Sequence, residues 1–330
     1  MGALDGLKVV EVAGLGPGPF CAMVLADMGA EVLRVDRASA VDGADGDPET
    51  RQPDYLLYRG RRSVALDLKH PDGLATLLTL VAGADVLIEG FRPGVAERLG
   101  FGPDVCLARN PRLVYGRMTG WGQEGANVRE PGHDINYIAR TGALDAIGRA
   151  GGPPTPPLNL VGDFGGGGML LAIGVLAAVL SARATGAGQT VDAAMVDGAA
   201  LLMTGFFGWR DLGTWSEERG TNLLDGGAPF YDVYATSDGK HVSVGAVEPQ
   251  FYAALVGVLG LDVEDLPPQN DRATWPAVKA RFAEVFRTRT RAEWVEAMTG
   301  QEACFAPVLS MDEARTDPVN LARGIFVEVG

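Results

Sequence analysis

One stretch of the chain, residues 132–168, holds residue types that can move a proton. It contains one of only three histidines, His133, followed thirty residues later by the carboxylate of Asp163 and then by four glycines, residues 165–168. An imidazole and a carboxylate can exchange acid and base roles, and glycines let a ligand approach the backbone without side-chain obstruction. The stretch therefore predicts proton transfer, with backbone N–H groups stabilising a developing oxyanion.

The glycines open a strongly apolar segment, residues 169–180, which is too long for a typical strand and predicts a buried helix. Asp163 would then lie near the N-terminus of that helix, beside the positive end of its dipole and its unpaired N–H groups. Each residue also has an ordinary structural explanation. An aspartate at a helix start is most often a cap, and a lone histidine in a turn is often a structural hydrogen-bonding group.

Five short motifs, in the order found here, resemble those of the α-methylacyl-CoA racemases, members of the class III CoA-transferase superfamily. They are Gly16-Pro17-Gly18-Pro19-Phe20, Gly132-His133-Asp134-Ile135-Asn136-Tyr137, Asn159-Leu160-Val161-Gly162-Asp163-Phe164, Leu224-Asp225-Gly226-Gly227-Ala228-Pro229 and Glu248-Pro249-Gln250-Phe251. The resemblance covers nearly the whole chain. It implies that His133 and Asp163 are the acid/base residues on opposite faces of the substrate, that Glu248 partners the histidine, and that Asn159 joins the same hydrogen-bond network. Gly165 and Gly166 would lie near the thioester.

The activity that the resemblance implies is racemisation or epimerisation of a 2-methylacyl-CoA, through removal and return of the α-proton by way of an enolate. A class III CoA-transferase is the alternative, and there Asp163 would be a nucleophile. His133 and residues 247–250 favour the racemase, and the second glycine-rich loop frequent in transferases of the superfamily is not visible. A catalytically silent CoA-binding subunit is a third hypothesis. No separate cofactor is expected, because coenzyme A is part of the substrate.

A net charge of −14 argues against broad binding of nucleic acid or anionic lipid, so an anionic ligand needs a local basic patch. Basic side chains of the first half gather at the ends of predicted elements: Arg37, Arg61, Arg62, Lys69, Arg92 and Arg98. By resemblance, Arg37, Arg92 and Arg98 contact the phosphates and adenosine of coenzyme A, and we assign Lys69 to the same site. Arginine forks suit phosphate oxygens because they bind two at once.

Strand-like and helix-like segments alternate through the first part of the chain, which predicts a parallel sheet covered by helices. The expected strands are residues 7–12, 31–35, 63–68, 85–89, 113–118 and 189–193, with helices at 20–28, 70–82 and 195–209. We therefore expect an α/β protein of the class III CoA-transferase fold, with a large, doubly wound, Rossmann-like domain. Residues 14–19 resemble a dinucleotide fingerprint, but Pro19 stands where its third glycine is needed, which argues against a nicotinamide site.

The rest of the chain differs in kind and predicts a smaller α+β domain. Residues 229–235 and 241–244 flank a Ser-Asp-Gly turn and predict a hairpin. Helices are expected at 249–259, 275–286 and 291–298, and another beginning at 311. We expect a large domain over 1–209, a linker over 210–228 and a small domain over 229–316. Residues 317–330 would begin a segment that returns to the first domain and continues in family members, with a strand at 326–330. The resemblance also implies an interlocked homodimer.

The three cysteines, Cys21, Cys106 and Cys304, show neither metal-site spacing nor an even count, which suits a reducing cytosol and predicts no metal. The N-terminus does not resemble a signal peptide. The longest apolar run, residues 169–180, is too short to span a bilayer as a helix. We expect a soluble, cytoplasmic protein.

Overall fold

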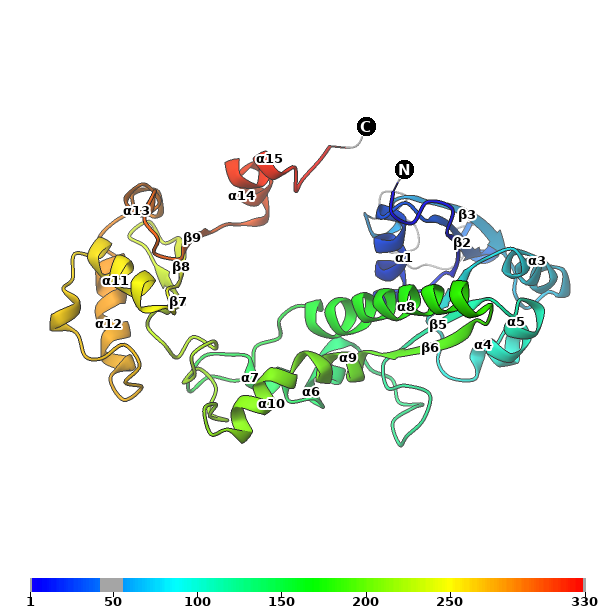
Figure 1. Ribbon diagram of the computed structural model, residues 1–330, viewed down its shortest axis with the longest axis horizontal. Coiled ribbons are helices and arrows are strands. Elements are labelled where there is room, and N and C mark those ends of the chain that lie inside the picture. The colour runs from blue at the N-terminus through cyan, green and yellow to red at the C-terminus, as the bar shows by residue number, and fades with distance from the viewer. Residues whose placement is uncertain (1, 42–55, 329–330) are drawn as a thin grey trace. The chain divides into compact units, whose positions relative to one another are not determined.

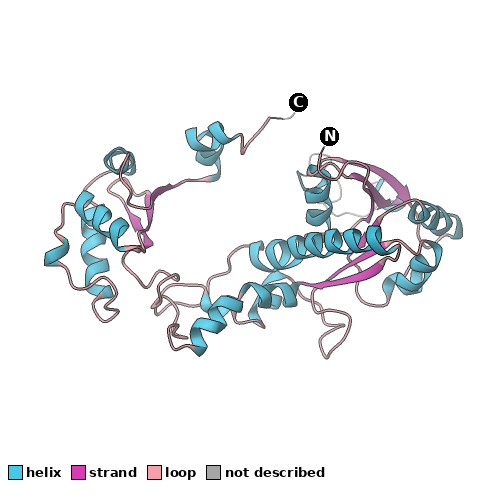
Figure 2. Cartoon of the chain, viewed as in Figure 1, coloured by secondary structure: helices cyan, strands magenta, loops and turns pink. Residues whose placement is uncertain are grey.

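The computed structural model describes residues 2–41 and 56–328, and its contacts divide the chain into two compact units. Unit 1 consists of Met1–Asp145 and Pro156–Trp209, and unit 2 consists of Ala146–Thr155 and Arg210–Gly330. The sequence analysis placed all of residues 1–209 in one domain, whereas the contacts group Ala146–Thr155 with the second unit. Figure 2 marks the helices and strands of both units.

Unit 1 is built on a six-stranded parallel sheet in the order β3-β2-β1-β4-β5-β6 (Figure 1). The strands are β1 (Lys8–Val12), β2 (Glu31–Arg37), β3 (Arg61–Leu66), β4 (Val86–Glu89), β5 (Val114–Thr119) and β6 (Gln189–Ala194). All residues of β4 and β5 are buried, as expected for parallel strands that helices cover on both faces. This is the order of a doubly wound sheet, so the predicted fold class is confirmed.

Helices on the two faces of the sheet form two separate cores. Alternate residues of each strand point to opposite faces, so Val9 packs with α1 (Pro17–Asp27) and α8 (Leu170–Thr185), while Val10 packs with α3 (Pro71–Ala82) and α5 (Pro103–Arg109). In Figure 1, α8 runs along β5 and β6. The core that contains Val9, α1 and α8 packs against the predicted catalytic stretch, residues 132–168.

The apolar helix of this core begins earlier than predicted, because the glycine run is itself helical. A π-helix, η2 (Leu160–Met169), continues directly into α8. The combined 26-residue helix is long and apolar enough, by length and composition, to cross a membrane, so the expectation that no segment reaches that length was wrong. The core helix of a globular unit passes the same test, and 44% of its most apolar window is buried inside this protein.

The remaining elements of this part of the chain are short. They are α2 (Ala38–Val41), η1 (Leu56–Tyr58), α4 (Val95–Leu99), α6 (Asp134–Ala139), α7 (Ala143–Ala146), α9 (Met195–Leu202) and α10 (Thr204–Asp211). Of these, α6 and α9 contact η2, and α4 follows the C-terminal end of β4.

Unit 2 packs helices on a three-stranded antiparallel sheet, β7 (Tyr231–Ala235), β8 (His241–Gly245) and β9 (Phe305–Val308). The helices are α11 (Pro249–Val258), η3 (Val263–Asp265), α12 (Trp275–Phe286) and α13 (Arg291–Met298). The predicted hairpin and helices are confirmed, whereas β9 was not foreseen. Large aromatic side chains fill the core: Phe230, Phe282, Phe286 and Trp294 are fully buried.

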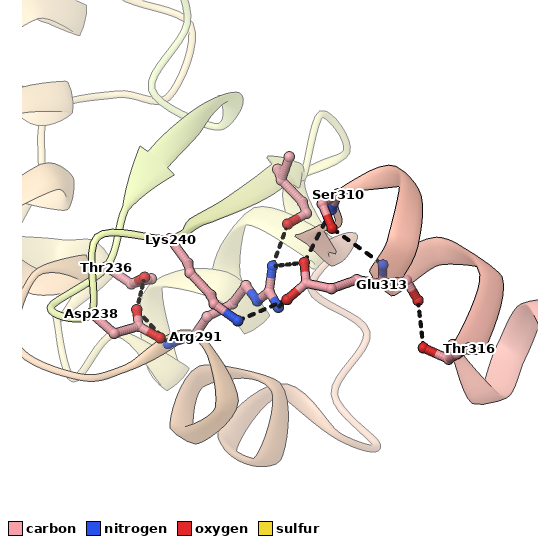
Figure 3. A network of polar contacts seen from close by, with 8 residues as sticks. Thr236, Asp238, Lys240, Arg291, Ser310, Glu313 and Thr316 are labelled. Carbon is pink, nitrogen blue, oxygen red and sulfur yellow. Dashed lines mark hydrogen bonds and ion pairs between the residues drawn. The ribbon is translucent and has the colours of Figure 1, made fainter.

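A polar network attaches α14 (Met311–Thr316) to the hairpin and to α13 (Figure 3). The Glu313 carboxylate accepts hydrogen bonds from Lys240 (2.7 Å) and from both terminal nitrogens of Arg291 (2.6 and 2.9 Å), and it closes a capping box with Ser310. These contacts, those of Arg291 first, hold the pKa of Glu313 well below its ordinary value.

After α15 (Pro318–Arg323), residues 326–328 are not in a strand, in contrast to the prediction, and 329–330 lie outside the described residues.

Candidate active site

His133 occupies the N-cap of α6, directly after the last loop before that helix. The Asn136 side chain accepts the backbone N–H of His133 at 3.0 Å, so the first turn of α6 fixes the backbone that carries the imidazole. Gly132 lies against the ring of Tyr137, where an added Cβ would come within 2.9 Å. His133 is exposed.

Asp163 lies in the first turn of η2, and its carboxylate accepts a hydrogen bond of 3.0 Å from the Asn159 side chain. Partial burial raises the pKa of Asp163, and the Asp134 charge adds to the rise, while the Asn159 hydrogen bond and the His133 charge oppose it. The structure thus brings three of the predicted site residues together: Asn159 is bonded to Asp163, and His133 is close enough to act on its pKa. A raised pKa moves a carboxyl towards the range in which it exchanges protons near neutral pH.

The N–H groups at the start of η2 have a partner inside the protein. The backbone N–H groups of Gly162 and Asp163 both donate to Asp134 Oδ2, at 2.6 and 2.7 Å. Both donors are therefore occupied by a carboxylate. The expectation that backbone donors of the glycine-rich helix start stabilise an oxyanion stays a prediction.

The glycine run serves helix packing. An added Cβ at Gly166 would lie 2.6 Å from the backbone nitrogen of Ala199 in α9, and one at Gly168 would lie 2.7 Å from the Phe20 ring in α1. Gly165 is half-buried, and its Cβ would meet the Leu160 carbonyl oxygen at 3.0 Å. Close packing against α9 thus accounts for a glycine at 166, and Gly165 lies against the backbone of its own helix. The expectation that both lie near a thioester stays a prediction.

The first motif of the chain lies directly against Asp163. Gly16, at the N-cap of α1, has a positive φ of 65°, and a Cβ there would lie 3.3 Å from Asp163 Oδ2. The Phe20 ring stacks on Phe164 with ring centroids 4.7 Å apart. Motifs far apart in the sequence therefore converge on one carboxylate.

Two of the predicted CoA-binding residues line a cavity of about 610 Å³ at the C-terminal ends of β1, β2 and β3. Arg37 is the last residue of β2, and Lys69 lies in the loop after β3. Val12 and Phe91 contribute to the apolar walls of the cavity. Doubly wound sheets bind ligands at the C-terminal ends of their strands. The lining also includes Asp36, whose carboxylate pairs with Arg34, and Asp67. The cavity thus has the location of a ligand site, with Arg37 and Lys69 as the cations on its wall.

The other two, Arg92 and Arg98, line a second cavity of about 360 Å³ together with Arg129. Val95 lines both cavities, so they adjoin. Arg129 was missed, because it lies in an irregular loop without a recognisable motif. Arg61, counted in the basic cluster from the sequence, is instead paired with the buried Glu11 and donates to the Pro19 carbonyl oxygen at 2.5 Å.

Glu248 lies in unit 2 at the N-cap of α11, and its side chain is exposed. It is close to Cys304, whose pKa is raised by burial and further by the Glu248 charge. Its pairing with His133 stays a prediction. Among the described residues, no group of three or more His, Cys, Asp or Glu side chains is arranged to hold a metal ion.

Comparisons with known proteins identify the family. The family model of CoA-transferase family III matches residues 4–330. The chain is 48% identical to the alpha-methylacyl-CoA racemases of Mus musculus (99% of this chain, 83% of the relative) and Homo sapiens (98% and 82%). A solved CAIB/BAIF family protein from Brucella suis matches with a TM-score of 0.83 at 25% identity, covering 99% of this chain and 89% of that one.

Proposed function

The chain belongs to CoA-transferase family III, and on that premise we propose that it is a 2-methylacyl-CoA racemase or epimerase, an isomerase. One observation carries the proposal. A chain 48% identical to alpha-methylacyl-CoA racemases over nearly its full length holds Asp163 bonded to Asn159 and within the electrostatic influence of His133. A two-base proton transfer requires two groups that can each exchange a proton, one on each face of the α-carbon, and an imidazole and a carboxylate can fill these roles.

The proposed reaction removes the α-proton on one face of the thioester and returns a proton on the other. When the Asp163 carboxylate takes the proton, the His133 imidazolium supplies one to the opposite face, and the roles exchange in the reverse direction. The raised pKa of Asp163 supports this role, because a weaker carboxylic acid is a better base once ionised. We include Glu248 as the partner of His133 on the basis of family resemblance.

We assign the CoA moiety to the two adjoining cavities. CoA carries a pyrophosphate and a 3′-phosphate, and Arg37 with Lys69, and Arg92 with Arg98, supply cations on the two cavity walls. Replacing Arg92 with Ala is expected to weaken CoA binding by about 1–3 kcal/mol, with no change for a pantetheine thioester that lacks the nucleotide. Arg109→Ala, at an exposed arginine on α5, is the matched control. Unchanged CoA affinity in Arg92→Ala would contradict the assignment.

A CoA-transferase is the second candidate, favoured by the half-buried position of Asp163 beside Gly16. A carboxylate so placed can attack a thioester carbonyl and form a mixed anhydride, releasing CoA as a thiolate. This mechanism needs an acceptor acid, whereas proton transfer does not.

The deciding experiment incubates the protein with one enantiomer of a 2-methylacyl-CoA in heavy water, without an acceptor acid. We expect deuterium at the α-carbon by NMR, inversion of configuration, and an unmodified Asp163 by mass spectrometry. His133→Ala and Asp163→Asn are each expected to slow inversion of configuration by roughly 10²–10⁴-fold. His241→Ala, at an exposed histidine of β8, serves as control and keeps the activity. An adduct on Asp163 without α-exchange would favour the transferase.

We also propose a homodimer, interlocked as the family resemblance implies, with Glu248 supplied by either chain. Support comes from an apolar stripe on α8 and the end of η2, where Met169, Ile173 and Leu180 recur at helical spacing on one face. Ile173 and Leu180 are 65% and 69% exposed. Exposed apolar patches of this kind mark surfaces that associate with other proteins.

A cytoplasmic location is proposed from the cysteine chemistry. Cys21 and Cys106 are buried free thiols, and Cys304 is free and exposed. Free thiols persist in a reducing compartment. Cell fractionation tests this proposal, and recovery of the protein in an organelle would contradict it.

A further inference from the structure

The Asp134 carboxylate joins two motifs that lie apart in the sequence. Asp134 is the first residue of α6 and only 6% exposed. Its Oδ2 accepts the backbone N–H groups of Gly162 (2.6 Å) and Asp163 (2.7 Å), which belong to the first turn of η2. The residue beside His133 therefore fixes the backbone that carries Asp163.

Gly162 is shaped to receive this carboxylate. An added Cβ at Gly162 would lie 2.5 Å from Asp134 Oδ2 and 2.9 Å from its Cγ, closer than atoms can approach. Glycine at 162 and aspartate at 134 thus form a complementary pair. Any other residue at 162 would push the carboxylate away from both N–H groups.

The Asp134 carboxylate also carries a charge, which its packing against Gly162 does not explain. The second oxygen of Asp134, Oδ1, is buried and makes no hydrogen bond among the described residues, which costs free energy. The carboxylate is favoured by the positive end of the long η2–α8 helix. It acts on Asp163, whose pKa is raised by burial first and by Asp134 in addition. The other groups that act on Asp163 are Asn159 and His133.

We propose that Asp134 is a positioning residue for proton transfer, which fixes the orientation of Asp163 through two backbone bonds and keeps a negative charge beside it. The inference rests on the proposed function, because it assigns Asp134 a task in that reaction. Asp134 does not exchange a proton with substrate. It sets where the Asp163 carboxylate lies and how basic that carboxylate is.

The test compares Asp134→Asn and Asp134→Ala in the direction in which Asp163 takes the proton. The asparagine keeps an oxygen for the two N–H groups but loses the charge, so the acid limb of the kcat/KM profile is expected to move to lower pH, with KM changed by less than about twofold. The alanine variant loses both the oxygen that accepts the two N–H groups and the charge. Its kcat is expected to fall on the order of 100-fold, because Asp163 is misplaced. Gly162→Ala should show a similar fall in kcat, because its Cβ displaces the carboxylate from both N–H groups.

Asp104→Asn, which removes an exposed charge from the first turn of α5, is the control and should leave the acid limb in place. An unmoved acid limb in Asp134→Asn, or an equal movement in Asp104→Asn, overturns the inference. If Asp134→Ala does not fold, Asp134→Asn decides alone. If the wild-type protein shows no α-proton exchange, the proposed function is overturned. If the wild type exchanges the α-proton but the acid limb of the kcat/KM profile does not move in Asp134→Asn, only the role of Asp134 is overturned.

Discussion

Opposing influences act on the Asp163 carboxyl, and single substitutions can separate them. Burial and Asp134 raise its pKa, while the 3.0 Å hydrogen bond from Asn159 favours the ionised form and lowers it. Asn159→Leu removes that bond, so the pKa of Asp163 should rise further. The acid limb of kcat/KM is then expected to move to higher pH, opposite in sign to Asp134→Asn. A limb that stays in place, or moves to lower pH, would contradict this assignment of the bond.

At the residue scale, the sequence predicted candidate catalytic side chains but not which side chains touch. His133, Asp163 and Asn159 were predicted because their motifs match a family. The hydrogen bonds to Asp134 were not predicted, because its partners Gly162 and Asp163 come close only through folding. Arg61 was counted with the exposed cations, since nothing in its neighbours reveals that Glu11 lies beside it on the sheet.

At the scale of elements, the glycine run gives a second prediction. Gly166→Ala should reduce stability by about 1–3 kcal/mol, because the new methyl group would overlap the α9 backbone at Ala199. Gly208→Ala, in α10 with no atom within 4 Å of the added Cβ, is the matched control and should be neutral or slightly stabilising. Denaturant midpoints of both variants measure the difference. A Gly166→Ala variant as stable as the control would mean that α9 moves aside without cost.

The network of Figure 3 predicts a local response to acid. Because the folded-state pKa of Glu313 lies below its ordinary value of 4.5, its stabilising contribution is fully present above that pH and is lost as the pH falls towards the folded-state pKa. The protection factors of the α14 amides, which correct the exchange rates for the slower intrinsic exchange at lower pH, should therefore fall below about pH 4.5 in the wild type. Glu313→Gln should show faster exchange already at pH 7, with less pH dependence.

Asp312→Asn, at the exposed neighbouring residue, controls for loss of charge and should behave as the wild type. Equal protection of α14 in Glu313→Gln and the wild type at pH 7 would show that the ion pairs do not hold this helix.

The elements that the sequence missed have two different physical causes. A run of four glycines ordinarily indicates a loop, yet η2 is helical because α1 and α9 pack against it and exclude side chains. The strand β9 has four residues and contains Pro307, so it shows no clear alternation and lacks one backbone donor. The central strands β1 and β4 were predicted well because burial on both faces makes them largely apolar.

At the scale of the whole molecule, the apolar stripe on α8 makes self-association testable. Ile173→Glu combined with Leu180→Glu should weaken the homodimer by more than about tenfold, because burying either carboxylate is costly. Val105→Glu, on α5 at the other face of the sheet, is the control. Sedimentation velocity over a range of concentrations distinguishes monomer from dimer. A wild-type protein that stays monomeric and active would contradict the dimer.

The parallel sheet also has a consequence for how the chain reaches its native state. Val114 on β5 pairs with Gln189 on β6, and Val9 on β1 pairs with Val86 on β4, so neighbouring strands meet only after long intervening segments have been ordered. Chains dominated by such distant pairings have high contact order, and they refold slowly because loop-closure entropy is lost before the contacts form. Larger chains also populate collapsed intermediates with unpaired strand edges, which aggregate. Refolding of this protein should therefore be slow and yield more native protein at low concentration.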